Sequence, residues 1–538
     1  MPEDLRRHVW DVEHYGFVLE ATVFPDLKAA LRDNKLAAWN NILADQSDAE
    51  IPQTGHLGFR PIAGGSGQFA VANFDADDRQ PVDGAGFVWW LQNLRSEFDD
   101  CSSSLGLVRL VPDEANLQSG WMSVWRLRLA GRNSNGPIEA EVELELRLSS
   151  VSDDIGQRSG WVQSITVLRQ TGLKANQSWF QETTADSGLN RPQRYDNWTA
   201  DRFVPNTGGA YVTDFDRDGH LDVFVDDFAD GNRLYRGRGD GTFEDVTAES
   251  GIDPGGPNRG WTLSCWADLD NDGDDDLIVE DRLYENLGSG RFRDVTEQTN
   301  LPLTPAAGYA VGDYDVDGRL DLYVCHTSAY RIGQSERSRV KWIDDGLGID
   351  NVLLRNLGDW QFQDVTEQMQ AGGDGSSCFA AVWLHANDDD RPDLFAINEF
   401  GINSLLLSQP DGPFVSTDVD PVFGGFSMGV AAGDYDNNGR TDLYVANMYS
   451  KAGNRILANV DRNRYPRELY RKIEEGTRGS KLYRATADAT FETVPADDMF
   501  AYVGWAYGPT FADFDNDGWL DIYATAGFKS EERGKPDG

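Results

Sequence analysis

The stretch Asp214-Phe215-Asp216-Arg217-Asp218-Gly219-His220-Leu221-Asp222 decides the fold of the C-terminal two-thirds of the chain. It places aspartates at positions 1, 3, 5 and 9 of a nine-residue loop, with glycine at position 6, and the apolar run Val223-Phe224-Val225 follows directly. Alternate side chains of such a loop converge, and the glycine permits the sharp turn that brings them together. The pattern predicts an oxygen-lined loop that leads into a buried strand.

The same pattern recurs along the chain, so that six loops can be aligned. Loops two, three, five and six are well formed: Asp268, Asp270, Asp272, Gly273, Asp274 and Asp276; Asp313, Asp315, Asp317, Gly318, Arg319 and Asp321; Asp434, Asp436, Asn438, Gly439, Arg440 and Asp442; and Asp513, Asp515, Asp517, Gly518, Trp519 and Asp521. Loop four is degenerate, because positions 1, 3, 5, 6 and 9 are His385, Asn387, Asp389, Asp390 and Asp393.

Each loop belongs to a larger repeat. A run of small and apolar residues such as 308–312 precedes the loop, and a Leu-Tyr segment such as 283–284 and a Phe-x-Asp-Val-Thr segment such as 292–296 follow it. This order predicts four short strands per unit, which is typical of propeller blades. For residues 178–538 we therefore expect a mainly β fold, a β-propeller with six countable blades, or seven if a blade without the loop lies in the long gaps after loops three and five.

The ends of the repeat region suggest how a ring would close. The last repeat ends near Phe528 without an outer strand, whereas an isolated outer-strand segment, residues 180–184, precedes the first repeat. We expect that segment to complete the last blade, because pairing the two ends of the chain removes an exposed sheet edge.

The loops have the ligand chemistry of calcium sites. Calcium takes about 6–8 oxygen ligands, which the side chains at positions 1, 3, 5 and 9 would supply together with the position 7 carbonyls of His220, Asp274, Arg319, Arg440 and Trp519. The alternative is a hairpin turn with solvated acids, but crowded carboxylates raise one another's pKa when no cation is present. We therefore predict a calcium ion in each of the five well-formed loops.

Loop four is expected to hold no ion. The ring nitrogen of His385 is poorly suited to a hard cation, and only Asp389 and Asp393 remain as charged ligands in register. Asp390 replaces the glycine that the turn favours, so a positive φ there would be strained. Arg391 is placed to pair with the spare carboxylates, and a proline follows it.

These repeats resemble the FG-GAP/VCBS repeat propellers, as in integrin α-subunits and the cartilage acidic protein family. The segments 449–456 and 504–507 resemble the cartilage acidic protein branch in particular. The resemblance implies calcium held in the blade loops as a structural element, binding or adhesion as the usual role, and an extracellular or periplasmic location. It names no ligand.

The sequence pattern of residues 1–177 differs from that of the repeats and predicts a smaller α+β domain. Helices are expected at 24–44 and 88–98, and strands at 105–111, 121–129, 138–148 and 161–169. Helices followed by a curved sheet resemble the NTF2-like fold, which often holds a pocket. The segment 73–78 mimics an aspartate loop, but Pro81 stands at its position 9.

Composition limits the function. A formal net charge of -42 argues against nucleic acid and anionic membrane surfaces as partners, and no apolar run is long enough for membrane insertion. No apolar segment follows residues 1–8, so no signal peptide is expected at this end. Four cysteines, of which Cys265, Cys325 and Cys378 fall in expected strands, do not form a disulfide framework.

No catalytic motif is recognised, and none of the six histidines shares metal-ligand spacing with another. The leading hypothesis is a binding, adhesion or scaffold module for a protein or a glycan. The alternative is a polysaccharide lyase or dehydratase, with its site at the propeller channel or in the N-terminal pocket. The 16 tryptophans fit either stacking on sugars or packing between blades.

Overall fold

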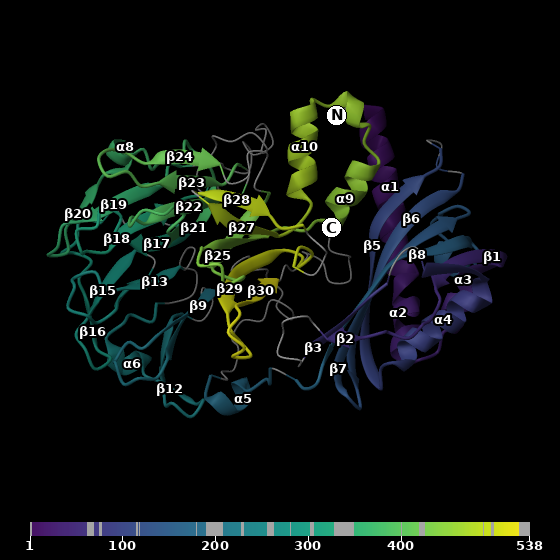
Figure 1. Cartoon of the computed structure of the whole chain (residues 1–538), viewed down its shortest axis with the longest axis horizontal. Helices are drawn as coiled ribbons and strands as arrows, with labels where there is room; N and C mark the ends of the chain where they lie inside the picture. Colours follow the sequence, from purple (N-terminus) through teal and green to yellow (C-terminus); the bar gives the residue numbers. More distant parts are fainter. Residues whose placement is uncertain are drawn as a thin grey trace. The chain divides into compact units, whose positions relative to one another are not determined.

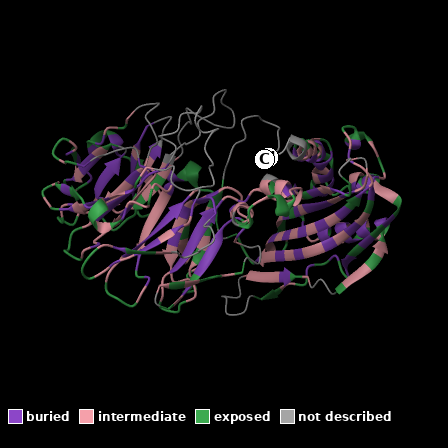
Figure 2. Cartoon of the chain, turned by 90° about the horizontal axis from the view of Figure 1, so that it is seen from above, coloured by how far each residue is buried: buried purple, intermediate pink, exposed green. Residues whose placement is uncertain are grey.

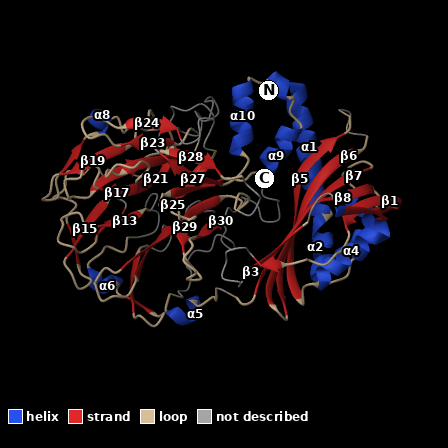
Figure 3. Ribbon diagram, viewed as in Figure 1, coloured by secondary structure: helices blue, strands red, loops and turns tan. Residues whose placement is uncertain are grey.

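The computed structural model describes residues 3–61, 69–74, 78–114, 117, 119–178, 180–189, 208–227, 231–255, 263–279, 281–301, 306–327, 349–399, 401–418, 425–487, 489–495 and 500–526. Over these residues the protein is mainly β (Figure 3), and none of its helices combines the length and the apolar character of a membrane span. The chain divides into two compact units. Unit 1 holds the residues up to Gln181 together with Ser450–Pro466, and unit 2 holds Glu182–Tyr449 and the described residues from Arg467 onward.

Unit 1 is built on one sheet with helices packed against it (Figure 1). Its strands are β1 (Leu43–Pro52), β2 (Arg60–Pro61), β3 (Phe69–Asn73), β4 (Arg79–Asp83), β5 (Asp100–Pro112), β6 (Trp121–Asn133), β7 (Gly136–Leu148) and β8 (Val162–Ala175), and its helices are α1 (Glu3–Thr22), α2 (Phe24–Arg32), α3 (Ala37–Ile42), α4 (Gly84–Ser96), η2 (Ile155–Gln157), α9 (Lys451–Ala458) and η4 (Arg462–Arg464). The main path runs β2-β3-β8-β7-β6-β5, and β1 pairs with β4 and, in parallel, with β8. Burial alternates along β7, as its period-two sequence predicts.

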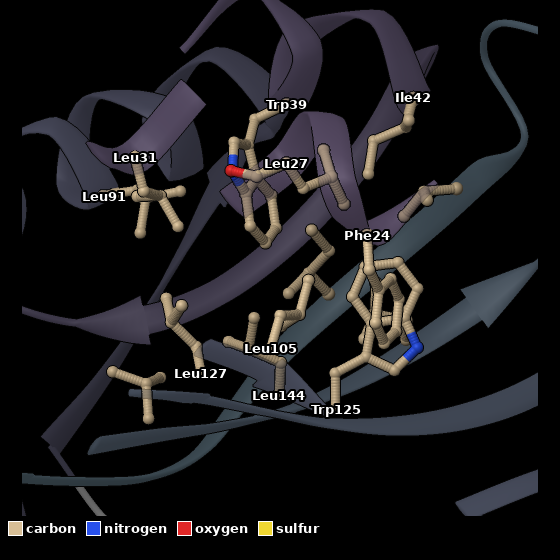
Figure 4. Close-up of a cluster of buried hydrophobic side chains, with 14 of the residues drawn as sticks. Phe24, Leu27, Leu31, Trp39, Ile42, Leu91, Leu105, Trp125, Leu127 and Leu144 are labelled. Carbon is tan, nitrogen blue, oxygen red and sulfur yellow. The ribbon is translucent and has the colours of Figure 1, made fainter. Parts of the chain in front are cut away.

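The core of unit 1 lies between the helices and the long strands β5, β6 and β7 (Figure 4). Side chains from α2, α3 and α4 meet side chains of the sheet in one buried cluster, which includes Phe24, Leu27, Leu31, Trp39, Ile42, Leu91, Leu105, Trp125, Leu127 and Leu144. Phe24 packs edge-to-face on Trp125 at 4.9 Å between ring centroids. Trp39 keeps its indole N–H satisfied by donating to the Leu27 carbonyl oxygen at 3.2 Å.

The four strands predicted in this region are confirmed and extend beyond the predicted bounds. The single helix predicted over 24–44 is wrong: α2 ends at Arg32, because Asn34 takes a left-handed φ of 55°, and α3 follows before β1 begins at Leu43. The helix predicted over 88–98 starts earlier, at Gly84, since the Asp83 side chain caps it by accepting from the Gly86 N–H at 2.8 Å. The mimic at 73–78 lies partly outside the described residues.

Helix α9 comes from the repeat half of the sequence but packs in unit 1. Its Arg455 is 4% exposed and donates to both carboxylate oxygens of Glu13, at 3.1 and 2.9 Å, and to the Leu107 carbonyl oxygen at 3.0 Å. Asn459, just after the helix, donates to the Leu110 carbonyl oxygen at 2.7 Å. These contacts attach the segment to α1 and β5.

The described residues of unit 2 form five four-stranded antiparallel sheets and a two-stranded one, here called sheets one to six. Their strands are β9 (Gly208–Thr213), β10 (Asp222–Asp227), β11 (Arg233–Gly237) and β12 (Phe243–Asp245); β13 (Ser264–Ala267), β14 (Asp276–Val279), β15 (Arg282–Asn286) and β16 (Phe292–Asp294); β17 (Gly308–Gly312), β18 (Asp321–Cys325), β19 (Val352–Asn356) and β20 (Phe362–Asp364); β21 (Cys378–Leu384), β22 (Asp393–Asn398), β23 (Ser404–Leu407) and β24 (Val415–Asp418); β25 (Ser427–Gly433), β26 (Asp442–Asn447), β27 (Lys481–Ala487) and β28 (Thr490–Thr493); and β29 (Ala506–Ala512) and β30 (Asp521–Ala526). The helices are α5 (Thr184–Ser187), α6 (Thr247–Ser250), α8 (Thr366–Met369) and α10 (Arg467–Gly476). Four strands per repeat, as predicted, are thus confirmed in sheets one to five.

Consecutive sheets pack through their first strands, so that β9 contacts β13, β13 contacts β17, and so on to β29. The second strands of sheets two to five, β14, β18, β22 and β26, are buried throughout because neighbouring sheets cover both of their faces, whereas β30 of sheet six is largely exposed; Figure 2 shows the burial of the whole chain. Cys325 and Cys378 lie buried in β18 and β21 as free thiols, and Cys265 lies half-buried in β13. The strand predicted at 180–184 is wrong: residues 181–183 have no regular structure, and Thr184 begins α5.

The pair between Arg455 and Glu13 generates a stability prediction for unit 1. Arg455→Ala should lower its unfolding free energy by about 3–5 kcal/mol, because it leaves the Glu13 carboxylate without its partner. The double variant Arg455→Met with Glu13→Leu should recover much of that loss, since it removes both charges. Urea denaturation of the natural protein, the double variant and the single variants Arg455→Met and Glu13→Leu measures the coupling, and a cost below about 1 kcal/mol for Arg455→Ala would contradict the assignment.

Candidate metal centre

Each aspartate loop connects the first and second strands of its sheet, and position 9 is the first residue of the second strand. The position 6 glycines all have positive φ, from 83° at Gly439 to 92° at Gly273. The position 4 residues of loops one, two, three, five and six are also left-handed, with φ between 54° and 63°. The turn that the glycine pattern predicts is therefore present in these five loops.

Backbone N–H groups of the turn hold the carboxylate at position 1. In loop three, Asp313 Oδ1 accepts from the Asp317 N–H at 2.9 Å and Oδ2 accepts from the Gly318 N–H at 2.8 Å. The same pair of bonds is made by Asp214, Asp434 and Asp513, and Asp268 accepts from the Gly273 N–H at 3.0 Å. These bonds fix the orientation of the first carboxylate.

The aspartate at position 9 ties the loop to the rest of its sheet. Asp276 is 1% exposed; its Oδ2 accepts from the Leu269 N–H at 2.9 Å and its Oδ1 from the Asn286 N–H, at the end of the third strand, at 2.8 Å. Equivalent pairs are made by Asp222, Asp321, Asp393 and Asp442. Asp521 makes only the first of these two bonds with a described residue: its Oδ2 accepts from the Phe514 N–H at 3.1 Å.

Five groups of three aspartates place one carboxylate oxygen from each residue within 4.8 Å of the others. The groups are Asp214, Asp216 and Asp218; Asp268, Asp270 and Asp276; Asp313, Asp315 and Asp321; Asp434, Asp436 and Asp442; and Asp513, Asp515 and Asp521. They fall in the five loops predicted to bind an ion, and each is able to hold a metal ion. Loop four, whose residues are all described, contributes no such group.

Some predicted ligands lie outside these groups. Asp222, Asp272, Asp317 and Asp517 lie in the same loops but do not belong to these groups of three. At position 5 the side chain, including that of Asn438, accepts from the position 7 N–H in all five loops. The side chains of Asp274, Arg319 and Arg440 form ion pairs with Arg217, Asp317 and Asp388. The ligand roles of the position 7 carbonyls, including those of His220 and Trp519, stay predictions.

Four loops each contain a carboxylate oxygen that is shielded from solvent and has no hydrogen-bond partner. These atoms are Oδ1 of Asp216, Asp268, Asp315 and Asp436. A buried carboxylate oxygen without a donor is costly, because it has lost its hydration and gained nothing in return. Its chemistry suits a hard cation, which binds oxygen and needs no hydrogen. The residues present therefore fit a calcium ion in these loops.

Burial and neighbouring carboxylates raise the pKa of the position 9 aspartates. Burial is the largest cause, and the aspartates at positions 3 and 5 add to it, while the backbone N–H bonds act in the opposite direction. The pKa rises to about 8 for Asp276, about 7 for Asp321, and about 6 for Asp222 and Asp442. At neutral pH a proton or a cation is therefore favoured most strongly at Asp276 and Asp321.

Loop four replaces the ion-binding arrangement with a hydrogen bond. The His385 ring nitrogen Nδ1 lies 3.1 Å from the Arg391 carbonyl oxygen, the position 7 carbonyl that would otherwise face an ion. Asp390 does not take a positive φ, so the strain expected there is avoided by a different turn. The ion pair expected of Arg391 is not formed with any described residue. Asp393 keeps both of its backbone bonds, at 3.0 and 2.8 Å.

Contacts between neighbouring loops are a feature that the sequence reasoning missed. From position 4, Arg217 pairs with Asp274 at 3.0 Å, and Asn271 and Asn437 donate to the carbonyl oxygens of Gly318 and Gly518 at 2.7 and 2.9 Å. Each contact joins one loop to the loop of the next sheet. Asparagine at position 4 of loops two, five and six (Asn271, Asn437 and Asn516) was the available signal, because asparagine tolerates left-handed backbone.

A second missed group lies at the end of the third strand. Asn286 and Asn356 donate to the carbonyl oxygens of Phe215 and Leu269, at 2.9 and 2.7 Å, and thereby reach the position 2 backbone of the preceding loop. At position 2, Phe215, Leu269 and Tyr314 are buried, whereas Phe514 is exposed. The recurrence of asparagine after the Leu-Tyr segment was visible in the sequence.

Comparison with known protein families identifies repeats in the region that contains the aspartate loops. The FG-GAP-like repeat family matches residues 204–279, 386–445 and 474–524. The chain contains FG-GAP-like repeats. The matched regions include loops one, two, five and six and most of the degenerate loop four, whereas loop three lies outside them although its pattern is complete.

Similarity to individual proteins is weak. A comparison with curated proteins gave no match. Among solved structures, the V. cholerae biofilm matrix protein Bap1 is 14% identical over 46% of this chain and 36% of that one, with a TM-score of 0.26. BBS1N in complex with ARL6DN is 11% identical over 58% and 90%, with a TM-score of 0.28, and a loop truncation variant of IdmH is 16% identical over 27% and 86%, with a TM-score of 0.17. Likenesses at this level carry no argument about function.

The contrast between loop four and the others generates a crystallographic prediction. Crystals soaked in a lanthanide, a calcium mimic with a strong anomalous signal, should show peaks in loops one, two, three, five and six. Loop four should show none, because His385 already bonds the position 7 carbonyl. The double variant His385→Asp with Asp390→Gly should gain a peak. A full-occupancy peak beside Asp389 in the unchanged protein would contradict the prediction.

The raised pKa values generate a pH prediction. A carboxyl whose pKa is higher in the folded than in the unfolded state stabilises the fold below its ordinary pKa of about 4, and that contribution is lost as pH rises through the folded pKa. In excess chelator, the melting temperature should therefore fall between pH 6 and 8, where ordinary carboxylates are already ionised. Saturating calcium should remove this fall, because the cation replaces the proton.

Thermal melts across that range, with and without chelator, measure the effect. His326, whose pKa burial lowers, acts in the opposite direction and limits the slope. Asp276→Asn should flatten the slope in chelator, since its carboxyl has the highest of these pKa values. A chelated protein whose melting temperature rises with pH over this range is the result that contradicts the assignment.

Proposed function

We propose that this chain is a calcium-stabilised FG-GAP propeller that serves as a binding or adhesion module. The observation that carries the proposal is the set of partnerless, solvent-shielded carboxylate oxygens in loops one, two, three and five. A calcium ion in each loop would supply positive charge to these oxygens. The chain's own residues hold the ligands in place: the position 6 glycine turns the loop, and the position 9 aspartate anchors it to the third strand.

A ring of blades is supported by the way consecutive sheets are joined. Gly251, which ends α6, packs against the Phe292 carbonyl oxygen of the next sheet, where an added Cβ would lie 2.6 Å from that atom. Gly188, which ends α5, stands in the same relation to Phe243 of sheet one, at 2.4 Å. The α5 segment therefore contacts sheet one as the α6 segment at the end of sheet one contacts sheet two. This supports a ring in which sheet six precedes sheet one.

The binding role rests on the type of repeat and on the form of the molecule. Rigid stacked sheets present loops and strand ends as fixed surfaces, which suits recognition of a protein or a glycan. An extracellular or periplasmic location fits calcium as a permanent structural element, and the closer likeness to the cartilage acidic protein type and the NTF2-like assignment of unit 1 belong to the same proposal. Catalysis on polysaccharide stays the alternative hypothesis.

Chelation tests the structural role of calcium. If each of the five loops is filled at about ten times its dissociation constant, binding contributes about 1.4 kcal/mol per site, or about 7 kcal/mol in all. That equals the total stability of many domains. Removal of calcium should therefore lower the melting temperature of unit 2 sharply, and magnesium should restore less than calcium because it dehydrates reluctantly.

Differential scanning calorimetry in calcium, in magnesium and in chelator, with metal content confirmed by mass spectrometry, makes the measurement. The control is a variant with Asp216, Asp268, Asp315 and Asp436 each changed to Asn; because loop six stays intact, this variant should keep only a small part of the difference between calcium and chelator. If the natural chain melts at the same temperature with and without calcium, the proposal is refuted.

A further inference from the structure

A large groove opens between sheets three and four of unit 2. Its volume is about 1230 Å³, and its lining comes from β19, α8 and the 372–376 turn on one side and from β22, β23 and β24 on the other. The groove lies at the ends of β18 and β22 opposite the aspartate loops, which precede those strands in the chain. It is therefore separate from the metal centre.

The groove has a strongly acidic rim. Asp350, Asp364, Glu367 and Asp374 line it and are exposed, and no Lys, Arg or His is among the described lining residues. The carboxylates of Asp350, Glu367 and Asp374 form no hydrogen bond or ion pair with any described residue, and Asp364 accepts only from the Thr366 N–H, at 3.0 Å. None of the four belongs to a group close enough to share one metal ion. Their spacing suits separate positive charges.

A buried acceptor in the same groove points to a ligand. Asn398, at the end of β22, is 3% exposed and lines the groove. Its Nδ2 donates to the Ile402 carbonyl oxygen at 2.7 Å, but its Oδ1 is shielded from solvent and has no partner. An acceptor of this kind is expensive unless a donor reaches it. A ligand N–H entering the groove would supply that donor.

The floor of the groove is apolar. Tyr323, Leu406 and Phe414 line it and are buried at 0%, 5% and 3% exposure, and the Tyr323 hydroxyl is already engaged with the Ala371 carbonyl oxygen at 3.0 Å. An apolar floor beneath a charged rim suits a chain with an aliphatic stem and a charged end, such as a lysine side chain. The volume exceeds the range of about 300–1,000 Å³ that is usual for small-molecule sites.

We propose that this groove binds an extended basic peptide segment of a partner protein. Its lysine or arginine side chains pair with Asp350, Glu367 and Asp374, and a backbone or side-chain N–H donates to Asn398 Oδ1. The proposal rests on the proposed binding function and gives it a partner class: a protein that presents a lysine- or arginine-rich segment. Calcium in the aspartate loops keeps the sheets in place but does not contact the peptide.

The test measures binding of a fluorescein-labelled heptapeptide of alternating lysine and glycine by fluorescence anisotropy. Saturating calcium is present throughout, so that the aspartate loops are occupied and do not compete. The groove variant carries Asp350→Asn, Glu367→Gln and Asp374→Asn. Its matched control carries Glu249→Gln, Asp281→Asn and Glu297→Gln, which are exposed on sheets one and two, remove the same charge and do not line the groove.

The groove variant should weaken binding at least about tenfold and the control less than about twofold, because long-range attraction to a chain of net charge -42 is the same for both. Asn398→Ala should cost about two- to tenfold, as expected for one hydrogen bond. Carbodiimide cross-linking followed by mass spectrometry should attach the peptide to Asp350, Glu367 or Asp374.

Equal weakening in both variants, or absence of binding by the natural chain, overturns the proposal. Displacement of the peptide by spermidine at equal amine concentration overturns the peptide assignment in favour of a small polyamine. Failure of the groove is distinguishable from failure of the proposed function. A chain that melts lower in chelator but does not bind the peptide refutes the groove alone, and a chain that binds the peptide but melts alike with and without calcium refutes the metal alone.

Discussion

The structure of the repeat unit depends on one buried carboxylate, the aspartate at position 9. Its two oxygens accept from the loop backbone at position 2 and from the third strand, so that three segments distant in sequence are held by one side chain. Each bond replaces a bond to water, and the burial that makes the pair strong also raises the carboxyl pKa. The more deeply the position 9 aspartate is buried, the more readily its carboxylate therefore takes up a proton or a cation.

Loop four separates the two roles of the aspartates. His385 and Asn387 have removed the charged ligands at positions 1 and 3, yet Asp393 keeps both backbone bonds and 0% exposure. Sheet four has four strands like its neighbours. The position 9 aspartate is thus sufficient for the strand arrangement, and the carboxylates at the other positions are the ones that an ion requires. In this loop the His385 ring nitrogen lies at hydrogen-bond distance from the position 7 carbonyl oxygen, which in the other loops is available to an ion.

The sequence predicted features that form within one short segment, such as the aspartate loops, but it could not predict hydrogen bonds between residues far apart in the chain. Alternation of aspartates around a glycine gives the turn and its convergent oxygens, because both follow from the backbone alone. The bonds from Asn286 to Phe215 and from Arg455 to Glu13 join residues 71 and 442 positions apart, and no pattern within one segment encodes them. The wrong helix at 24–44 has a local cause that was overlooked, since Asp33-Asn34 is a typical helix-ending pair. Residues 180–189 match residues 243–252, in which β12 precedes α6; the short helix is repeated as α5, but residues 180–183 do not form the strand, and whether that strand pairs is not encoded within the segment.

The seam between sheets three and four differs from its neighbours at both ends of the strands. At the loop end, contacts between described residues join loops one with two, two with three, four with five, and five with six. Loop three instead presents Val316 at position 4, an exposed β-branched residue held at a φ of 61°, which has no polar group to offer the next loop. At the opposite end lies the acidic groove, in which Asn398 Oδ1 has no hydrogen-bond partner. The core between the two sheets is filled by Tyr323, Leu353 and Phe414, and near the groove the N–H groups of Cys378 and Phe414 donate across the seam to the carbonyl oxygens of His326 and Met369. Apolar packing and these backbone bonds therefore hold the seam, while the carboxylates of Asp350, Glu367 and Asp374 on the groove rim form no bond with a described residue and are available to a ligand.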